Sequence, residues 1–222
     1  MTEIAVYVEG GGNDRSQKAA LRQGFDSLFH QEKSNAREQR MSLTFVCCGG
    51  RQEAFEAFKN AMTSNADRIN ALLVDSEGPI ALVPKDKEQD AVIRIAHLRQ
   101  TQGAGGRGQG DGWEIPNNLA ERVHLMVQCM EAWIVADPDA LANFYKQEFK
   151  RDKLPKRINL EEEPKADICS KLEEASGKTS KGAYGKIKHA SKLLAAIDPE
   201  RVADRCPRFR IFREWLSESI GA

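Results

Sequence analysis

The chain lacks any long apolar stretch. No segment of its 222 residues approaches the roughly 20 apolar positions that a helix needs to cross a bilayer. The N-terminus enters a short strand-like run and does not read as a signal peptide. The apolar fraction of 41% and the charged fraction of 30% are typical of globular proteins. We therefore expect a cytoplasmic protein that has no membrane partner.

Cysteines at metal-binding spacing are lacking as well. The five cysteines are odd in number and show no C-x-x-C spacing, so the sequence predicts neither a disulfide framework nor a zinc site. Cys47 and Cys48 fall in an apolar run, which favours a place in the core over a role as reactive thiols. Internal repeats, a Walker motif, a G-x-G-x-x-G turn and a zinc finger are all missing from the sequence.

The chain has no net charge, but its two parts differ in sign. Residues 1–145 contain 15 basic and 20 acidic residues, whereas residues 146–222 contain 18 basic and 13 acidic residues. We predict an α/β core over 1–145 and a basic helical extension over 146–222 that packs on it. The acidic part could hold a metal and the basic part could contact phosphates, although an unevenly charged ordinary surface is the alternative.

Four short apolar runs bounded by turn residues predict buried strands, and segments of helical periodicity separate them. This pattern indicates an α/β fold with a mostly parallel sheet of about four strands, flanked by helices and followed by a C-terminal helical extension. The polar residues 31–41 are expected to form an exposed connection. The glycine-rich residues 100–113 predict a mobile loop near the active edge, the alternative being a tolerated flexible insertion. The predicted strands are Ile4–Val8, Leu43–Cys48, Ile69–Asp75 and Arg122–Gln128.

Three acidic residues follow two of these strands. Glu9 comes directly after the first strand, while Asp75 and Glu77 come at the end of the third. The carboxyl ends of parallel strands meet at one edge of a sheet, where ligands collect. Asp75 and Glu77 are two residues apart, so in an extended chain their side chains would share a face. Carboxylates that converge in this way suit Mg²⁺ or Mn²⁺, the alternative being that they only solvate a turn.

Glycine-rich turns follow the first two strands. Gly10, Gly11 and Gly12 would let backbone amides approach a phosphate closely, and Arg51 begins the helix after the second strand. Arg51 is therefore a candidate phosphate clamp, or alternatively the partner in a salt bridge that orders the loop. Nucleotide binding at the three glycines is a weaker alternative, because no Walker lysine follows.

Further candidate residues lie in the second half of the chain. Glu131 follows the fourth strand and could be a fourth metal ligand, or could instead complement a helix dipole. Lys178 and Lys181 lie in a Lys-Ser-Gly-rich loop that precedes a helix, where a phosphate could be held. Lys181 is the first choice there, and Lys186 and His189 are candidate phosphate-binding residues on the following helix. His189 could equally be an ordinary helix residue.

Together these motifs resemble a known family. A glutamate after the first strand and an acidic pair after a later one is similar to the Toprim domain of topoisomerases, primases and overcoming-lysogenization-defect nucleases. More closely, the chain resembles an uncharacterised bacterial Toprim-like family, the domain of unknown function DUF4276, which is often encoded beside an ATPase in defence loci. The motifs that carry this resemblance are Val8-Glu-Gly-Gly-Gly, Cys48-Gly-Gly-Arg51, Leu73-Val-Asp-Ser-Glu-Gly-Pro79, His124-Leu-Met-Val-Gln-Cys-Met-Glu-Ala-Trp133 and Thr179-Ser-Lys-Gly-x-Tyr184.

The resemblance implies a nuclease that depends on Mg²⁺ or Mn²⁺ and hydrolyses phosphodiester bonds in DNA or RNA, in phage defence with an AAA/ABC-type ATPase partner. Glu9, Asp75 and Glu77 match the Toprim metal ligands, and Glu131 and Lys181 match later site residues. Glu77 departs from the aspartate that the family pattern has. The alternative is a non-catalytic effector or sensor module that docks on the ATPase. Whether the chain forms a homodimer is open.

Overall fold

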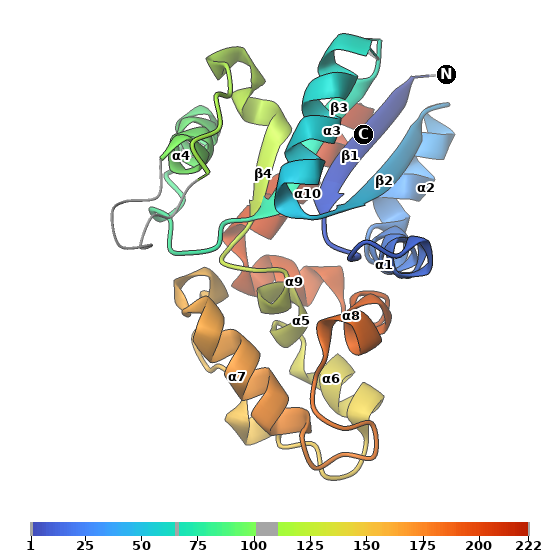
Figure 1. The fold of residues 1–222 in the computed structure, drawn as a ribbon, viewed down its shortest axis with the longest axis vertical. Coiled ribbons are helices and arrows are strands. Elements are labelled where there is room, and N and C mark those ends of the chain that lie inside the picture. The colour runs from blue at the N-terminus through green and yellow to red at the C-terminus, as the bar shows by residue number, and fades with distance from the viewer. Residues whose placement is uncertain (1, 65–66, 101–110, 222) are drawn as a thin grey trace.

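Four parallel strands form a single sheet in the order β2-β1-β3-β4 (Figure 1). The computed structural model describes residues 2–64, 67–100 and 111–221. Because every described strand runs in the same direction, all their carboxyl ends lie at one edge of the sheet. The α/β fold with a parallel four-stranded sheet is thus confirmed. The strands are β1 (Glu3–Glu9), β2 (Ser42–Gly49), β3 (Ile69–Asp75) and β4 (Val123–Met126).

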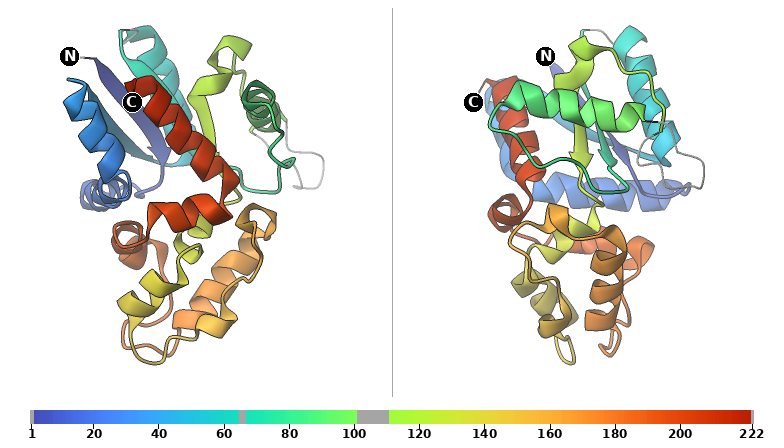
Figure 2. Two further views of the ribbon diagram at one scale, coloured as in Figure 1. Left: turned by 180° about the vertical axis from the view of Figure 1, so that it is seen from behind. Right: turned by 90° about the vertical axis from the view of Figure 1, so that its left-hand side faces the viewer.

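Helices cover both faces of the sheet, and alternation along β1 shows why. Ile4, Val6 and Val8 belong to one apolar cluster, while Ala5 and Tyr7 between them belong to the other. The first face is covered by α1 (Arg15–Leu28), α2 (His30–Glu38) and α10 (Pro207–Ile220), and the second by α3 (Arg51–Ser64) and α4 (Lys87–Arg99) (Figure 2).

A group of shorter helices lies beyond the carboxyl ends of the strands (Figures 1 and 2). One of them, α8, packs closely on α1 at Gly24, where a Cβ would come 2.7 Å from the carbonyl oxygen of Ser191. The group therefore closes over the edge where the acidic residues lie. Its members are α5 (Glu131–Val135), α6 (Pro138–Tyr145), α7 (Lys165–Ser176), α8 (Lys186–Leu194) and α9 (Pro199–Arg205), with 3-10 turns at η2 (Arg151–Lys153) and η3 (Leu160–Glu162). A further 3-10 turn, η1 (Asn117–Arg122), lies at the other end of the sheet, directly before β4.

The structure corrects one prediction about local structure. Residues 31–41 do not form an exposed connection, because most of them belong to α2. Glu32 is buried and its carboxylate accepts from the Arg213 guanidinium of α10 at 2.7 Å, while Ala36 is buried in the core. Tertiary contacts therefore stabilise a helix whose own sequence is almost entirely polar.

The C-terminal part returns to the sheet. Phe209 and Phe212 of α10 join Phe25 and Phe29 of α1 and its C-terminal end in one aromatic core against the sheet. One apolar cluster thus contains residues from both sides of position 146, and the division of the chain there stays a prediction. The loop predicted over 100–113 falls largely on 101–110, outside the described residues. Within the described ranges, no helix combines the length and the apolar character that crossing a membrane would need.

Candidate functional site

Three carboxylates converge at the carboxyl edge of the sheet. Glu9 is the last residue of β1 and Asp75 the last residue of β3, and these two strands are neighbours. Oxygen atoms of Glu9, Asp75 and Glu77 lie within 4.8 Å of one another. The Glu9 carboxylate also accepts the backbone N–H of Asp75 at 3.2 Å. Residues separated by more than sixty positions in the chain are therefore in contact, and we call these three residues the acidic cluster.

Glu77 reaches the acidic cluster by a different route from the one that strand alternation predicts. The strand ends at Asp75, and the backbone of Glu77 is left-handed, with φ at 63°. Its N–H donates to the carbonyl oxygen of Gln128 at 3.0 Å, which fixes the turn. A glutamate is unfavourable in this conformation, since its Cβ crowds the backbone. The turn, and not an extended strand, brings Glu77 beside Asp75.

Asp75 is the most enclosed member of the acidic cluster, with a relative exposure of 1%. One carboxylate oxygen accepts the N–H of Met130 at 2.9 Å. The other lies 3.7 Å from Lys165 Nζ and 3.8 Å from Lys186 Nζ. Burial raises the pKa of Asp75 to about 7, with Glu9 adding to the rise and the two lysines opposing it. The cluster thus holds a carboxylate whose charge is costly without a nearby cation.

Two lysines from the helical group supply positive charge to the acidic cluster. Lys165 Nζ, in the first turn of α7, lies 2.8 Å from both carboxylate oxygens of Glu77. Lys186 Nζ, at the start of α8, lies between Asp75 and Glu131, 3.8 Å from an oxygen of each. Burial opposes their charge, yet the neighbouring carboxylates raise the pKa of both lysines. Both therefore remain charged beside the acids.

Arg51 holds the other side of the acidic cluster. Its Nη1 lies 3.2 Å from Glu9 Oε2 and also donates to the carbonyl oxygen of Asp75. Its Nε and Nη2 donate to Asp111 at 2.8 and 2.7 Å, and its guanidinium lies over the Trp113 ring. This bonding fixes the position of Glu9. The role of Arg51 as a phosphate clamp stays a prediction, because a phosphate would have to compete with Asp111.

A cavity of about 340 Å³ adjoins the acidic cluster. Glu9 and Lys186 form part of its wall, and the turn Gly10–Gly12 forms another part. All three glycines have positive φ, and a Cβ on Gly11 would come 2.9 Å from the Lys18 backbone. Only glycine fits this turn without strain. The volume of the cavity is within the lower range of small-ligand sites, so one nucleotide-sized group could enter beside the acids.

Glu131 is close to the acidic cluster but is not among the three residues whose oxygens converge. Its carboxylate accepts the hydroxyl of Tyr184 at 3.0 Å, and Lys186 lies between it and Asp75. Burial, followed by the proximity of Glu131, raises the pKa of the Tyr184 hydroxyl, so tyrosine is the hydrogen-bond donor. A role for Glu131 as a fourth ligand of the same cation stays a prediction.

The remaining predicted residues lie on or next to the segment that joins α7 to α8, which extends to the end of the helical group farthest from the sheet (Figure 1). Lys178 is exposed, and Lys181 Nζ lies 5.0 Å from the centre of the Phe144 ring. His189 is buried, its Nδ1 accepts the N–H of Gly185 at 3.1 Å, and its ring packs near Tyr145. The described contacts of these three residues do not include the acidic cluster, so their phosphate-binding roles stay predictions.

Sequence reasoning missed Lys165 and the contact of Tyr184 with Glu131. Lys165 follows a proline at the start of a helix, and no local pattern distinguishes it from other lysines of this basic region. Tyr184 belongs to a predicted motif, but its partner lies 53 residues earlier in the chain. Only the folded chain shows these two contacts.

A family model described as "Domain of unknown function (DUF4276)" matches residues 8–217. The chain belongs to the DUF4276 family. The matched range of this DUF4276 protein includes all three members of the acidic cluster and both lysines that contact it. Searches of the curated proteins and of the solved structures found no match. The predicted family is thus confirmed, and the relationship to Toprim domains stays a prediction.

Proposed function

We propose that this protein is a divalent-metal-dependent nuclease that hydrolyses phosphodiester bonds in DNA or RNA. The observation that carries the proposal is the convergence of the acidic cluster, whose carboxylate oxygens lie within 4.8 Å of one another. Three hard oxygen donors from Glu9, Asp75 and Glu77 suit Mg²⁺ or Mn²⁺. The raised pKa of Asp75 supports this assignment, because a cation at the cluster would offset the cost of its buried charge.

The residues around the acidic cluster suit a phosphodiester substrate. A divalent cation held by Glu9, Asp75 and Glu77 would polarise the phosphate and lower the pKa of a bound water. Lys165 and Lys186 are placed to neutralise charge on the phosphate, and the glycine-lined cavity offers room beside them. Arg51 keeps Glu9 in place through its ion pair.

The wider biological setting is also part of the proposal. We infer a Toprim-like core from the glutamate that ends β1 and the acidic pair that begins at the end of β3, a pattern that resembles Toprim domains. We infer from the same resemblance a role in bacterial phage defence with an AAA/ABC-type ATPase partner. Both inferences depend on the motifs given above.

A cleavage assay tests the nuclease activity directly. The full chain, stripped of metal with EDTA, is incubated with labelled single- and double-stranded DNA and RNA, with and without added Mg²⁺ or Mn²⁺. We expect cleavage of at least one substrate only with the cation present. Asp75→Asn, Glu77→Gln and Glu9→Gln should each lower the rate by roughly 100-fold or more. The matched control is Glu56→Gln on α3, an acid whose side chain is 46% exposed and which should leave the rate unchanged.

A second candidate function is a non-catalytic module that docks on an ATPase. The observation that favours it is that Arg51, Lys165 and Lys186 already neutralise much of the charge of the acidic cluster. In that case the cluster would act as a buried network of ion pairs. A purified protein that binds neither Mg²⁺ nor Mn²⁺ and cleaves none of the four substrates would favour the module and contradict the nuclease.

A further inference from the structure

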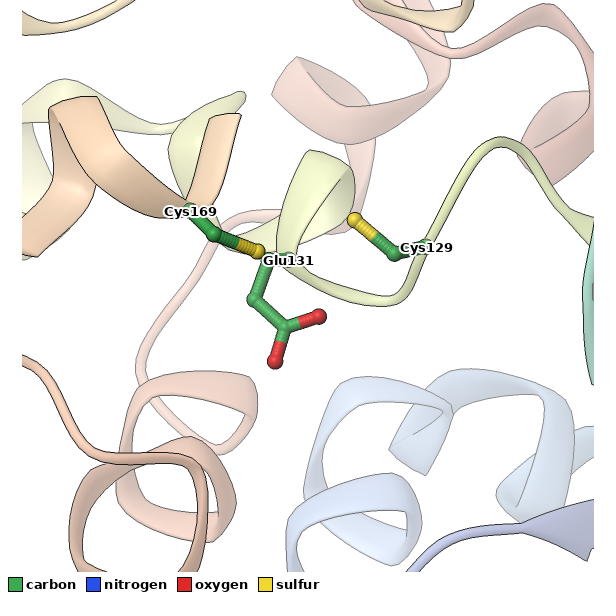
Figure 3. Close-up of side chains that lie close together, drawn as sticks. All are labelled: Cys129, Glu131 and Cys169. Atoms are coloured by element: carbon green, nitrogen blue, oxygen red, sulfur yellow. The ribbon is translucent and has the colours of Figure 1, made fainter. Parts of the chain in front are cut away.

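A second group of potential metal ligands lies on the far side of Lys186 from Asp75. The sulfur atoms of Cys129 and Cys169 and a carboxylate oxygen of Glu131 lie within 4.8 Å of one another. Figure 3 shows the two sulfurs pointing toward each other, Cys169 from α7 and Cys129 from the segment that precedes α5. We call these three residues the thiol cluster.

The donors of the thiol cluster differ in chemistry from those of the acidic cluster. Thiolate sulfur is a soft ligand that favours Zn²⁺ and other thiophilic cations over Mg²⁺. Two sulfurs and one carboxylate oxygen would supply three of the four positions of a tetrahedral zinc shell, leaving one for water. Cys129 and Cys169 are forty positions apart, which explains why the sequence shows no zinc-binding spacing.

The surroundings of the thiol cluster hold Glu131 in a fixed orientation. Tyr184 donates its hydroxyl to Glu131 Oε1 at 3.0 Å, and Lys186 Nζ lies 3.8 Å from the same oxygen. The other carboxylate oxygen is therefore the one available to a cation. Outer hydrogen bonds of this kind orient the ligands of known metal sites. Cys129 and Glu131 are buried and Cys169 is half-buried, so a cation could enter from the side of α7.

We propose that Cys129, Cys169 and Glu131 form a binding site for a thiophilic divalent cation of the zinc type. This site is separate from the acidic cluster, because Lys186 lies between Glu131 and Asp75. Bound zinc would join α7 to the segment around Cys129. The first turn of α7 carries Lys165, which contacts Glu77, and the backbone N–H of Met130 donates to Asp75. The thiol cluster would thereby fix the two elements that position the acidic cluster.

Cobalt titration tests this site, since Co²⁺ binds zinc sites and a thiolate–cobalt bond gives a strong near-ultraviolet charge-transfer absorption. The full chain is reduced, stripped with EDTA and titrated with Co²⁺, followed by competition with Zn²⁺. We expect the absorption to saturate at one equivalent and to be removed by Zn²⁺ but not by excess Mg²⁺. Cys129→Ala and Cys169→Ala should each abolish the band. Tyr184→Phe should weaken binding by roughly 10- to 100-fold, as for outer-shell partners of other metal sites.

Two controls separate this inference from general thiol binding and from the nuclease proposal. The double variant Cys47→Ala and Cys48→Ala removes two thiols outside the thiol cluster, the same number as the cluster contains, and should keep the cobalt band. Glu9→Gln should also keep it, even where it abolishes cleavage. Circular dichroism verifies that each variant is folded, and Cys169→Ser offers a milder change at a half-buried position.

Three results would overturn the proposal. One is the lack of a saturable cobalt band in the reduced parent protein. Another is an equal loss of the band in the Cys47 and Cys48 double variant. A third is an intramolecular Cys129–Cys169 disulfide in the parent whose reduction yields a protein that binds no zinc.

Discussion

Replacing Asp75 with asparagine should stabilise the metal-free protein at alkaline pH. The carboxyl group is almost fully buried, and its pKa is raised from 3.8 to about 7 in the folded chain. An acid whose folded pKa is raised binds protons more tightly in the native state. The protein therefore loses stability as the pH rises from the pKa of Asp75 in the unfolded chain toward its pKa in the folded chain. Below both pKa values Asp75 is protonated in both states and its ionisation costs no stability. Above both pKa values the full loss of stability is present.

The size of the effect follows from the same two values. The two pKa values of Asp75 differ by about 3, and each pKa unit is equivalent to about 1.36 kcal/mol. Ionised Asp75 therefore costs about 4 kcal/mol of stability at about pH 8. At about pH 4.5 the same calculation gives about 1 kcal/mol. Asparagine keeps an oxygen that can accept the Met130 N–H but has no charge to desolvate. The variant should thus exceed the parent in stability at alkaline pH by up to about 4 kcal/mol, and by much less in acid.

Urea denaturation in EDTA, followed by circular dichroism at both pH values, measures this difference. The matched control is Asp137→Asn, another buried aspartate. Its two carboxylate oxygens accept the N–H groups of Asp139, Ala140 and Asp198, so an amide with a single acceptor should destabilise the protein. An Asp75→Asn variant that is no more stable than the parent at alkaline pH would refute the reasoning, because the burial of ionised Asp75 would then have no net cost.

Three further predictions concern the neighbours of this site and the core. The Glu77→Gly variant should be more stable than the Glu77→Gln variant by about 1 kcal/mol in urea denaturation. Both variants lose the charge, but only glycine accepts a φ of 63° without strain. Equal stabilities would contradict this. The Lys165→Met variant should bind Mn²⁺ at least about tenfold more tightly in calorimetry, because the substitution removes a competing cation from Glu77. It should also cleave more slowly. Weaker Mn²⁺ binding would argue against a shared site. Arg208→Leu removes the ion-pair partner of buried Glu161 and one of the two partners of buried Asp90, and it should cost about 3–5 kcal/mol in thermal unfolding. The exposed control Arg201→Leu should cost within about 1 kcal/mol. Similar losses in the two variants would contradict the buried network.

The strands and the acidic cluster could be predicted from the sequence because their signals are local. Each strand is a short apolar run, and Glu9 and Asp75 end two of these runs. Parallel pairing then brings the ends together without any further information. The helix α2 could not be predicted in this way, since it is held by tertiary contacts such as the ion pair of Glu32 with Arg213, 181 residues later.

Contacts between the helical group and the sheet edge were beyond local reasoning. Lys165 meets Glu77 across 88 residues, and Cys169 meets Cys129 across forty. Glu131 follows a strand, as the acidic residues do, yet the short helix that begins there directs it toward Tyr184 and the thiols. The position of a residue after a strand predicts the edge at which it lies, but not which neighbours its side chain meets.

Anomalous diffraction from crystals soaked in Mn²⁺ tests the central claim most directly. The account predicts a peak bounded by carboxylate oxygens of Glu9, Asp75 and Glu77, with Lys165 Nζ displaced from its present position 2.8 Å from Glu77. A map without a peak at these three residues, with Lys165 still paired to Glu77, would contradict it.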